Sequence, residues 1–312
     1  MRREYGLDQI IYDPTSRVTV GTFDGVHLGH QAILRYLRQR VVEQGGHSVV
    51  VSFDPHPREV VTGRPVPLLT TIDERADLLE ALGIDRFIVI PFTPEFARLS
   101  AEAFVESVLV ARIGLQEIVI GYDHGFGRGR GGDARLLETL GEKHGFAVDV
   151  IPPQVVAEHV VSSTEIRTLL REAGDVRTAA RLLGRRYALA GEVVPGARRG
   201  RVIGFPTANL AVEHPRKVIP RQGVYAVLAR IEEEADPYGG MMNIGIRPTF
   251  EGQGLHLEVH LFDFQGDLYG RRLRIEFVER IRDERKFPSV EALVEQLSRD
   301  RERCMEALRA VT

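Results

Sequence analysis

Two histidines placed three residues apart are the first candidates for chemistry in this sequence. His27 and His30 lie in the stretch GTFDGVHLGH (21–30), directly after a short apolar run, where a buried strand would turn into a helix. Imidazole N–H groups at such a point can donate hydrogen bonds to phosphoryl oxygens and stabilise the charge that develops in a transition state. We therefore predict that His27 and His30 are catalytic in phosphoryl chemistry. A capping or packing role is the alternative for either histidine alone.

The other residues of this stretch would make room for a nucleotide. Gly21 and Gly25 allow a tight turn, and Gly29 would let a ligand approach the backbone of the new helix, whose free N–H groups attract phosphate. We expect the three glycines to bind nucleotide together with Phe23 and Asp24, although the sequence assigns no specific role to Asp24. A metal site is disfavoured, because no third ligand recurs at a telling spacing.

A second polar stretch, VSSTEIR (161–167), would suit a triphosphate. Ser162, Ser163 and Thr164 surround a predicted helix start, and Arg167 adds a positive charge. Backbone N–H groups at a helix start and a guanidinium are both good phosphate ligands. Ser-Ser-Thr before a helix is also ordinary capping, so this stretch by itself leaves both interpretations open.

The glycine-rich stretch GYDHGFGRGRGG (121–132) supports a competing interpretation. It contains G-x-G-x-x-G between a predicted strand and a predicted helix, with Asp149 downstream, as in nicotinamide- or flavin-dependent oxidoreductases. That fingerprint normally follows the first strand of the sheet, whereas here it follows the fourth. Arg128 and Arg130 also make the loop basic, which favours a mobile phosphate clamp.

The elements that must position these residues alternate between strands and helices over the first half of the chain. Thr71 and Glu74 form a capping box for a helix that would end at Gly83, and Ser100 would cap a helix that ends at Gly114. The apolar runs that indicate strands are 17–23, 48–53, 86–92, 117–122 and 146–151. This alternation predicts an α/β doubly wound parallel sheet, with its ligands at the carboxyl ends of the strands.

The chain changes character after a helical stretch at about 163–184. From residue 187 to 277, short β-rich runs alternate with glycine-containing turns, which predicts a small antiparallel β-barrel or sandwich. Ser289 would begin a C-terminal amphipathic helix that packs on the barrel, with Cys304 as a buried member of its apolar face. We place the boundary near residue 185, which gives domains 1–185 and 186–312.

The second domain carries its own candidates for chemistry. The basic, glycine-rich stretch 191–210 would cradle phosphates, and Thr207 and Asn209 offer two neutral oxygen ligands for a nucleotide-bound Mg²⁺. The expected phosphate-binding residues of this stretch are Gly196, Gly200, Arg201 and Gly204. Glu258 shares a strand face with His260 and is the candidate general base. By composition alone, a structural turn and a solvent-facing glutamate are the more common interpretations of these features.

Composition limits the possible function classes. The chain has 312 residues, of which 43% are hydrophobic and 27% charged, and its net charge of −3 gives no global attraction to nucleic acid or membranes. Its start lacks the apolar region of a signal peptide, and its single cysteine rules out an internal disulfide. We expect a cytoplasmic protein with small-molecule substrates, either a monomer or weakly self-associating.

The motifs together resemble one enzyme family over essentially the whole chain. GTFDGVHLGH and VSSTEIR are similar to the two signatures of the nucleotidyltransferase superfamily. GRVIGFPTAN (200–209), NIGIRPTF (243–250) and LEVHLFDFQGDLYG (257–270) are similar to riboflavin kinase signatures. This combination is typical of the bifunctional prokaryotic FAD synthetases. His124 and Gly125 depart from the family, which usually has an aromatic and a basic residue there.

The resemblance implies two ATP-dependent reactions. The barrel would transfer the γ-phosphoryl group of ATP·Mg²⁺ to riboflavin, giving FMN, with Glu258 as the general base. The first domain would adenylylate FMN, giving FAD and pyrophosphate. The implied flavin-binding residues are Asp123, Phe126, Phe205, Arg282 and Glu284. The alternatives are an oxidoreductase, and a non-catalytic flavin-binding barrel attached to another nucleotidyltransferase.

Overall fold

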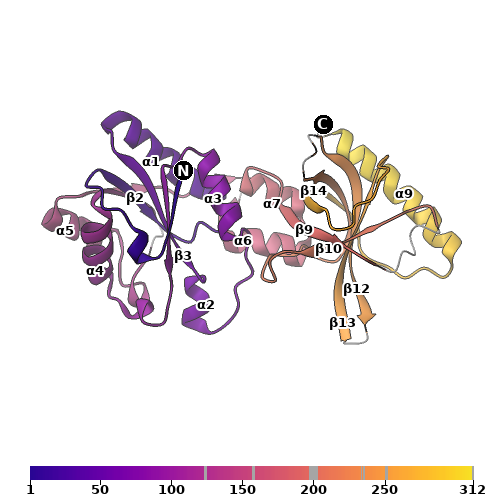
Figure 1. Cartoon of the computed structure of the whole chain (residues 1–312), viewed down its shortest axis with the longest axis horizontal. Helices are drawn as coiled ribbons and strands as arrows, with labels where there is room; N and C mark the ends of the chain where they lie inside the picture. Colours follow the sequence, from indigo (N-terminus) through magenta and orange to yellow (C-terminus); the bar gives the residue numbers. More distant parts are fainter. Residues whose placement is uncertain are drawn as a thin grey trace. The chain divides into compact units, whose positions relative to one another are not determined.

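The computed structural model divides the chain into two compact units, Met1–Ser163 and Thr164–Thr312. It describes residues 1–122, 125–156, 159–196, 203–232, 234, 236–249 and 252–310. The first unit is an α/β structure and the second contains a β-barrel (Figure 1). No helix in these described ranges is long and apolar enough to cross a membrane.

A six-stranded sheet forms the centre of the first unit. Its strands are β1 (Arg2–Tyr5), β2 (Ser16–Val20), β3 (His47–Asp54), β4 (Arg86–Pro91), β5 (Leu115–Gly121) and β6 (Ala147–Ile151). They pair in parallel in the order β1-β4-β3-β2-β5-β6. The five strands predicted from apolar runs are confirmed. The edge strand β1 was missed, because its sequence RREY has no apolar run.

Helices cover both faces of this sheet, as a doubly wound fold requires. They are α1 (Leu28–Gln44), α2 (Pro57–Thr62), α3 (Ile72–Ala81), α4 (Ala101–Phe104), which continues as the π-helix η3 (Val105–Ile113), and α5 (Ala134–His144). The short helices η1 (Leu7–Gln9), η2 (Phe96–Arg98) and η4 (Arg128–Arg130) and the hairpin β7 (Val155–Val156)–β8 (His159–Val160) complete the unit. The predicted capping box of Thr71 with Glu74 and the cap at Ser100 are both present.

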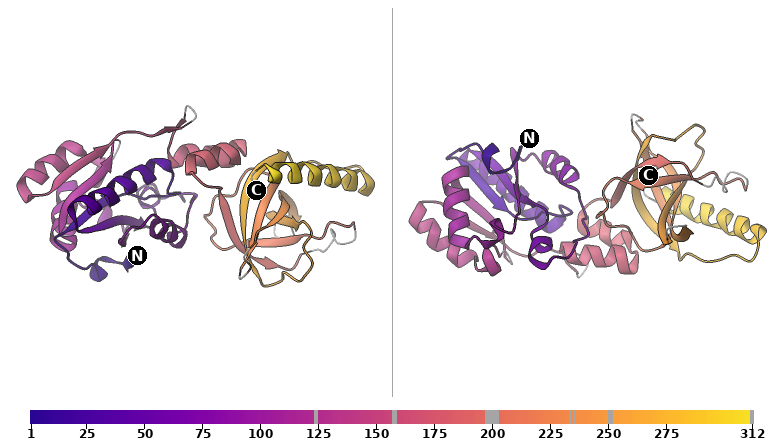
Figure 2. Two further views of the ribbon diagram at one scale, coloured as in Figure 1. Left: turned by 90° about the horizontal axis from the view of Figure 1, so that it is seen from above. Right: turned by 60° about the horizontal axis from the view of Figure 1, so that its bottom comes forward.

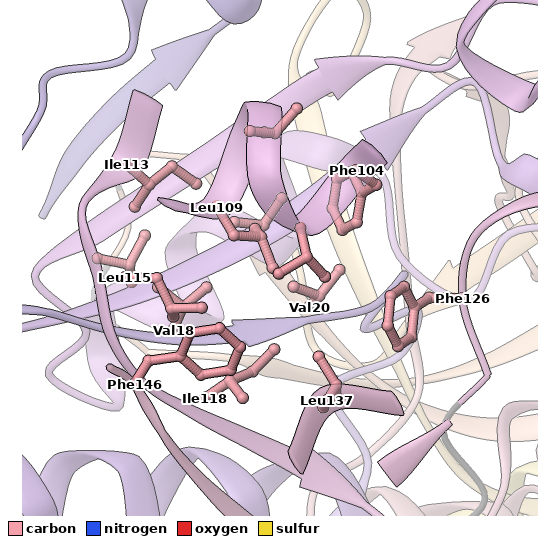
Figure 3. Close-up of a cluster of buried hydrophobic side chains, with 14 of the residues drawn as sticks. Val18, Val20, Phe104, Leu109, Ile113, Leu115, Ile118, Phe126, Leu137 and Phe146 are labelled. Atoms are coloured by element: carbon pink, nitrogen blue, oxygen red, sulfur yellow. The ribbon is translucent and has the colours of Figure 1, made fainter. Parts of the chain in front are cut away.

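The two sheet faces bury different side chains of the same strands, which explains their continuous apolar runs. Val49 and Val51 belong to one cluster together with side chains of α4, η3 and α5. Figure 3 shows part of this cluster, including Phe104 and Leu109. Val50, between them in β3, packs with α1 and α3 in the other cluster. A strand buried on both faces cannot alternate apolar with polar residues, so the runs could be identified as strands but not assigned to a face.

The second unit contains a closed six-stranded barrel, which decides between the predicted barrel and sandwich. The barrel strands are β9 (Ala188–Val194), β10 (Ala208–Val212), β11 (Gly223–Ile231), β12 (Tyr238–Thr249), β13 (Gly252–Leu261) and β14 (Arg272–Arg282). They pair antiparallel, and β14 meets β9 to close the ring. The helices α6 (Ser163–Thr168), η5 (Leu169–Ala173) and α7 (Val176–Leu183) precede the barrel.

The compact units divide earlier in the sequence than the predicted domain boundary near residue 185. Leu170 in η5 accepts a hydrogen bond from the Arg221 amide at 2.8 Å, and α7 reaches β14, where Arg177 pairs with Glu279 at 3.3 Å. These contacts join the helical stretch to the barrel, whereas the prediction placed it with the first domain. The boundary of the functional domains stays a prediction.

A long C-terminal helix covers the outside of the barrel. Ser289 begins α9 (Val290–Arg309), as predicted, and its side chain accepts a hydrogen bond from the Ala292 amide at 3.3 Å. Cys304 and Leu308 pack against Ala226 and Met241 on β11 and β12. Figure 2 shows this helix lying along the barrel. Burial raises the pKa of the Cys304 thiol to about 12, so this side chain behaves as the expected small hydrophobe.

Candidate functional sites

The turn that carries the two histidines lies at the point where the strand order of the sheet reverses. β2 has β3 on one side and β5 on the other, and the turn joins β2 to α1. Open α/β sheets bind ligands at the carboxyl ends of their strands at this switch point. The turn is tight, since Phe23, Gly25 and Val26 all have positive φ, at 48°, 85° and 39°.

The two histidine rings stack on each other at the start of α1. Their centroids are 3.6 Å apart with an interplanar angle of 16°, and the Phe23 ring lies 4.9 Å from that of His30. His27 is the N-cap of the helix, and its Nδ1 accepts a hydrogen bond from the His30 amide at 3.3 Å. A neutral imidazole that accepts through Nδ1 carries its proton on Nε2. His27 therefore combines the capping role with the tautomer that a phosphoryl donor needs.

Asp24 is a structural anchor of this turn. Its side chain is fully buried, and its carboxylate accepts hydrogen bonds from the Leu69 amide at 3.0 Å, the Thr70 amide at 2.8 Å and the Thr70 hydroxyl at 3.1 Å. The Arg75 guanidinium approaches it to 3.7 Å. These partners give the Asp24 side chain a positioning role, and the nucleotide contact expected of this residue stays a prediction.

The glycines of the turn make room for the protein's own rings. A Cβ atom on Gly29 would lie 3.2 Å from Nδ1 and Cε1 of His27, and one on Gly21 would lie 3.2 Å from the Phe23 ring. Phe23 itself is buried in a hydrophobic cluster. The side-chain space at both glycines is therefore set by neighbouring rings, while contact of their backbone with a nucleotide stays a prediction.

The structure brings part of the second polar motif to the histidine turn. The Ser163 hydroxyl donates a hydrogen bond to the Asp24 carbonyl oxygen at 2.8 Å. Ser162 belongs to the same compact unit, whereas Thr164 and Arg167 belong to the second. A bracing role for Ser163 follows from this bond. The triphosphate contacts of Ser162, Ser163, Thr164 and Arg167 stay a prediction.

The described part of the glycine-rich loop is tied to the start of α4. Phe126 and Gly132 exchange two backbone hydrogen bonds of 3.1 and 2.9 Å, and the Arg128 amide donates to the Leu99 carbonyl at 3.0 Å. A Cβ atom on Gly127 would lie 2.6 Å from Cα of Ala101. These contacts tie the described part of the loop to the fold, and its action as a phosphate clamp stays a prediction. Phe126 packs into the core beside Phe104, and Asp123, its expected partner at the flavin, lies outside the described residues.

A row of polar side chains crosses the barrel strands at the position of Glu258, the general base expected from the sequence. Asn209 on β10 is directly opposite Glu258 on β13, and Glu258 is directly opposite Asn243 on β12. Directly opposite residues in antiparallel strands point to the same face of the sheet. Val224 on β11 is directly opposite Asn243 and packs in the cluster under α9. The face that carries these residues is therefore the outside of the barrel. Sequence reasoning missed Asn243, whose only signal was its place in the family-like stretch NIGIRPTF.

The segment before β10 is fixed to the same face. Nδ1 of His260 lies 2.7 Å from the Pro206 carbonyl oxygen, and the His260 ring contacts Phe205 edge-on at 5.4 Å. Burial lowers the pKa of His260, with the Arg301 charge acting in the same direction. A neutral ring with its proton on Nδ1 fits the hydrogen bond to the carbonyl. His260 thus holds the peptide that leads into Thr207 and Asn209.

The remaining expected residues of the second unit have different surroundings. The side-chain amide group of Asn209 lies next to Gly196, so a Cβ atom on that glycine would collide with it. Gly204 has a φ of 82° and lies in the described turn before Phe205. Gly200 and Arg201 lie outside the described residues. In the part of the chain that the structure covers, no group of three His, Cys, Asp or Glu residues could hold a metal ion.

Two residues expected at the flavin are arranged differently from each other. The Arg282 guanidinium pairs with the buried carboxylate of Asp300 on α9, with Nη2 2.7 Å from Oδ2. This pairing gives Arg282 a partner inside the fold, and its contact with flavin stays a prediction. The Glu284 carboxylate instead lies against Cα of Gly245, on the barrel face that carries Asn243 and Glu258.

Comparison with known proteins identifies both units. The FAD synthetase family model matches residues 10–165, and the riboflavin kinase family model matches residues 183–308. The bifunctional riboflavin kinase/FMN adenylyltransferase of Pseudomonas fluorescens is 42% identical, over 90% of this chain and 89% of its own length. The protein of the same name from Escherichia coli K12 is 38% identical, over 91% and 90%.

A solved structure shows the same fold. It is named a macrolide-efflux protein from Streptococcus pneumoniae, has a TM-score of 0.88 and is 32% identical, covering 97% of this chain and 98% of its own. The two family models account for both units, and the enzyme relatives match nine-tenths of the sequence. The chain therefore belongs to the family of bifunctional riboflavin kinases/FMN adenylyltransferases.

Proposed function

We propose that each unit of this bifunctional riboflavin kinase/FMN adenylyltransferase carries one reaction, through the residues assembled above. The first unit adenylylates FMN, and the barrel phosphorylates riboflavin. The observation that carries the assignment is the pair of family models, of which one matches the unit with the stacked histidines and the other matches the barrel with the Asn209–Glu258–Asn243 row. The substrates are small molecules, and we propose the cytoplasm as the compartment.

In the barrel, Glu258 acts as the general base. It accepts the proton of the ribityl 5′-hydroxyl of riboflavin as that oxygen attacks the γ-phosphorus of ATP, and ADP leaves. Thr207 and Asn209 offer neutral oxygen atoms, which suit a Mg²⁺ ion that already carries nucleotide phosphates and water. His260 keeps the peptide before Thr207 in place through the Pro206 carbonyl. The ion, when bound, would neutralise charge on the phosphates.

In the first unit, the histidine turn stabilises charge and forms no covalent intermediate. A phosphate oxygen of FMN is already ionised, so it attacks the α-phosphorus of ATP without a general base, and pyrophosphate leaves. His27 and His30 donate hydrogen bonds to the phosphoryl oxygens. The Asp24 anchor and the Ser163 brace hold the turn that presents them. Ser162 and Ser163 contact the nucleotide in this proposal, and the nucleotide contacts of Thr164 and Arg167 are proposed from the sequence motif alone.

One experiment tests the division of labour. Riboflavin and FMN are supplied separately with ATP and Mg²⁺ to Glu258→Gln and His30→Ala, and the products are separated by chromatography. We expect Glu258→Gln to stop FMN formation while still converting supplied FMN to FAD, and His30→Ala to do the reverse. His47→Ala, at a histidine with 58% of its side chain exposed, is the matched control and should retain both steps. Loss of the same step in both site variants would contradict the assignment.

A further inference from the structure

A buried polar network ties the segment after β14 to the C-terminal helix. Nε of Arg282 lies 3.0 and 2.9 Å from the two carboxylate oxygens of Asp300, so this pair is held at several points. The Gln296 amide nitrogen donates to the same carboxylate at 2.7 Å, and its oxygen accepts from the Arg285 guanidinium. Two residues of one helix therefore hold two arginines that flank the segment 283–284.

Asp300 occupies a position where the helix would otherwise place an apolar side chain. It lies three residues after Leu297 and four before Cys304, which both pack in the cluster beneath the helix, and its side chain is fully buried. Burying a carboxylate is costly, and replacing a buried ion pair by apolar residues of similar volume is often neutral or stabilising. The apolar stripe already attaches the helix to the barrel. The ion pair therefore points to a requirement for geometry at the segment that it holds.

The anchored segment borders the proposed riboflavin kinase site. The Glu284 carboxylate lies against Gly245 of β12, two residues along that strand from Asn243. Residues two apart on a strand share a face, so Gly245 lies on the same barrel face as Asn243 and Glu258. The Phe287 ring lies under both anchored guanidinium groups, 5.6 Å from that of Arg282 and 4.9 Å from that of Arg285. Fixing the two arginines thus fixes the course of the chain on both sides of Glu284.

We propose that Asp300, assisted by Gln296, is a positioning residue for riboflavin. It holds the segment 283–287 against the Glu258 face, so that Glu284 is in place before the flavin binds. Loss of this anchor leaves the segment to be ordered by the substrate itself, which lowers riboflavin affinity and leaves the chemical step intact. This proposal rests on the assignment of the kinase reaction to the barrel.

The test compares Asp300→Asn with Cys304→Ala in the full-length chain. Asp300→Asn removes the charge from the anchor, whereas Cys304→Ala loosens the packing of the same helix one turn further on. We expect Asp300→Asn to raise the KM for riboflavin about tenfold with kcat changed less than about threefold, and to leave conversion of supplied FMN to FAD unchanged. Cys304→Ala should lower the melting temperature and leave that KM unchanged.

Two further measurements separate positioning from stability. The apolar pair Arg282→Met/Asp300→Leu leaves no unpaired charge, so it should melt near the wild-type temperature and still show the raised KM. Trypsin cleavage after Arg285 and Lys286, mapped by mass spectrometry, should be faster in Asp300→Asn than in wild type, and riboflavin should slow it. An unchanged KM in Asp300→Asn, or an equal rise in Cys304→Ala, overturns the proposal. Absence of FMN formation by the wild-type chain would instead overturn the kinase assignment on which it rests.

Discussion

In the turn after β2, two nearby polar residues, Asp24 and His27, have different roles. Asp24 turns both carboxylate oxygens inward to the amides of Leu69 and Thr70, whereas His27 uses one ring nitrogen for the helix cap and keeps its proton on the other. The first residue shapes the turn, and in our proposal the second acts at the phosphate. Residue type and spacing identify both as candidates, and hydrogen-bond partners tell them apart.

The anchor at Asp24 gives a prediction at this scale. In Asp24→Asn, one amide N–H of the 69–70 backbone faces an NH₂ group in place of an oxygen, and a buried donor left without an acceptor costs about 1–3 kcal/mol. We expect a lower melting temperature and a slower FMN-to-FAD step, with FMN formation from riboflavin unchanged. Asp8→Asn is the control, since its side chain is 98% exposed. Equal effects of the two substitutions would show that the buried contacts are unimportant.

The sequence identified the members of this turn but not their partners. The string GTFDGVHLGH marks the histidines because it is contiguous and lies after an apolar strand. The turn is completed by residues that are distant in the sequence, namely Thr70, Arg75 and Ser163. Thr70 is 45 residues from its partner Gly25, and Ser163 is 139 residues from its partner Asp24. Such contacts depend on how loops return to one edge of the sheet, which local periodicity does not encode.

At the scale of elements, the sequence predicted the strands that are buried on both faces and the helix that buries one face. The central strands read as continuous apolar runs and α9 as an amphipathic stripe, so both were identified from the sequence. β1 was not, because an edge strand needs pairing on one side only and RREY carries three charges. The register of β10, β12 and β13, which puts Asn243 opposite Glu258, also had no local signal.

His260 gives a prediction about the pH dependence of the barrel. Burial lowers its pKa in the folded state, with Arg301 acting in the same direction and Pro206 and Asp263 opposing it. Because the unfolded chain then binds more protons, stability is complete above the ordinary histidine pKa of about 6.5 and is lost as the pH falls below it. In His260→Asn the amide can still donate to Pro206 but does not titrate. We expect its denaturation midpoint to fall less than that of wild type between pH 8 and pH 5; parallel curves would contradict this.

At the scale of the whole molecule, our proposal places two sites in one chain, and only the barrel site uses protein side chains as Mg²⁺ ligands. Thr207 and Asn209 belong to the barrel alone, while ATP carries Mg²⁺ to both reactions in our proposal. We expect EDTA to stop both steps and added Mg²⁺ to restore both. Asn209→Ala should raise the Mg²⁺ concentration for half-maximal FMN formation about tenfold or more and leave FAD formation unchanged. A shift in both titrations would place the effect outside the barrel site.

The brace between Ser163 and Asp24 also has a consequence for how the protein is made. It joins residues 139 positions apart, and a ribosome adds roughly 5–20 residues per second. His27 and His30 are therefore synthesised several seconds before the hydroxyl group that closes their turn. All six strands of the sheet precede Ser163 in the sequence. A nascent chain that stops just short of this serine thus contains the complete sheet and both histidines, but lacks the last contact that fixes the turn between them.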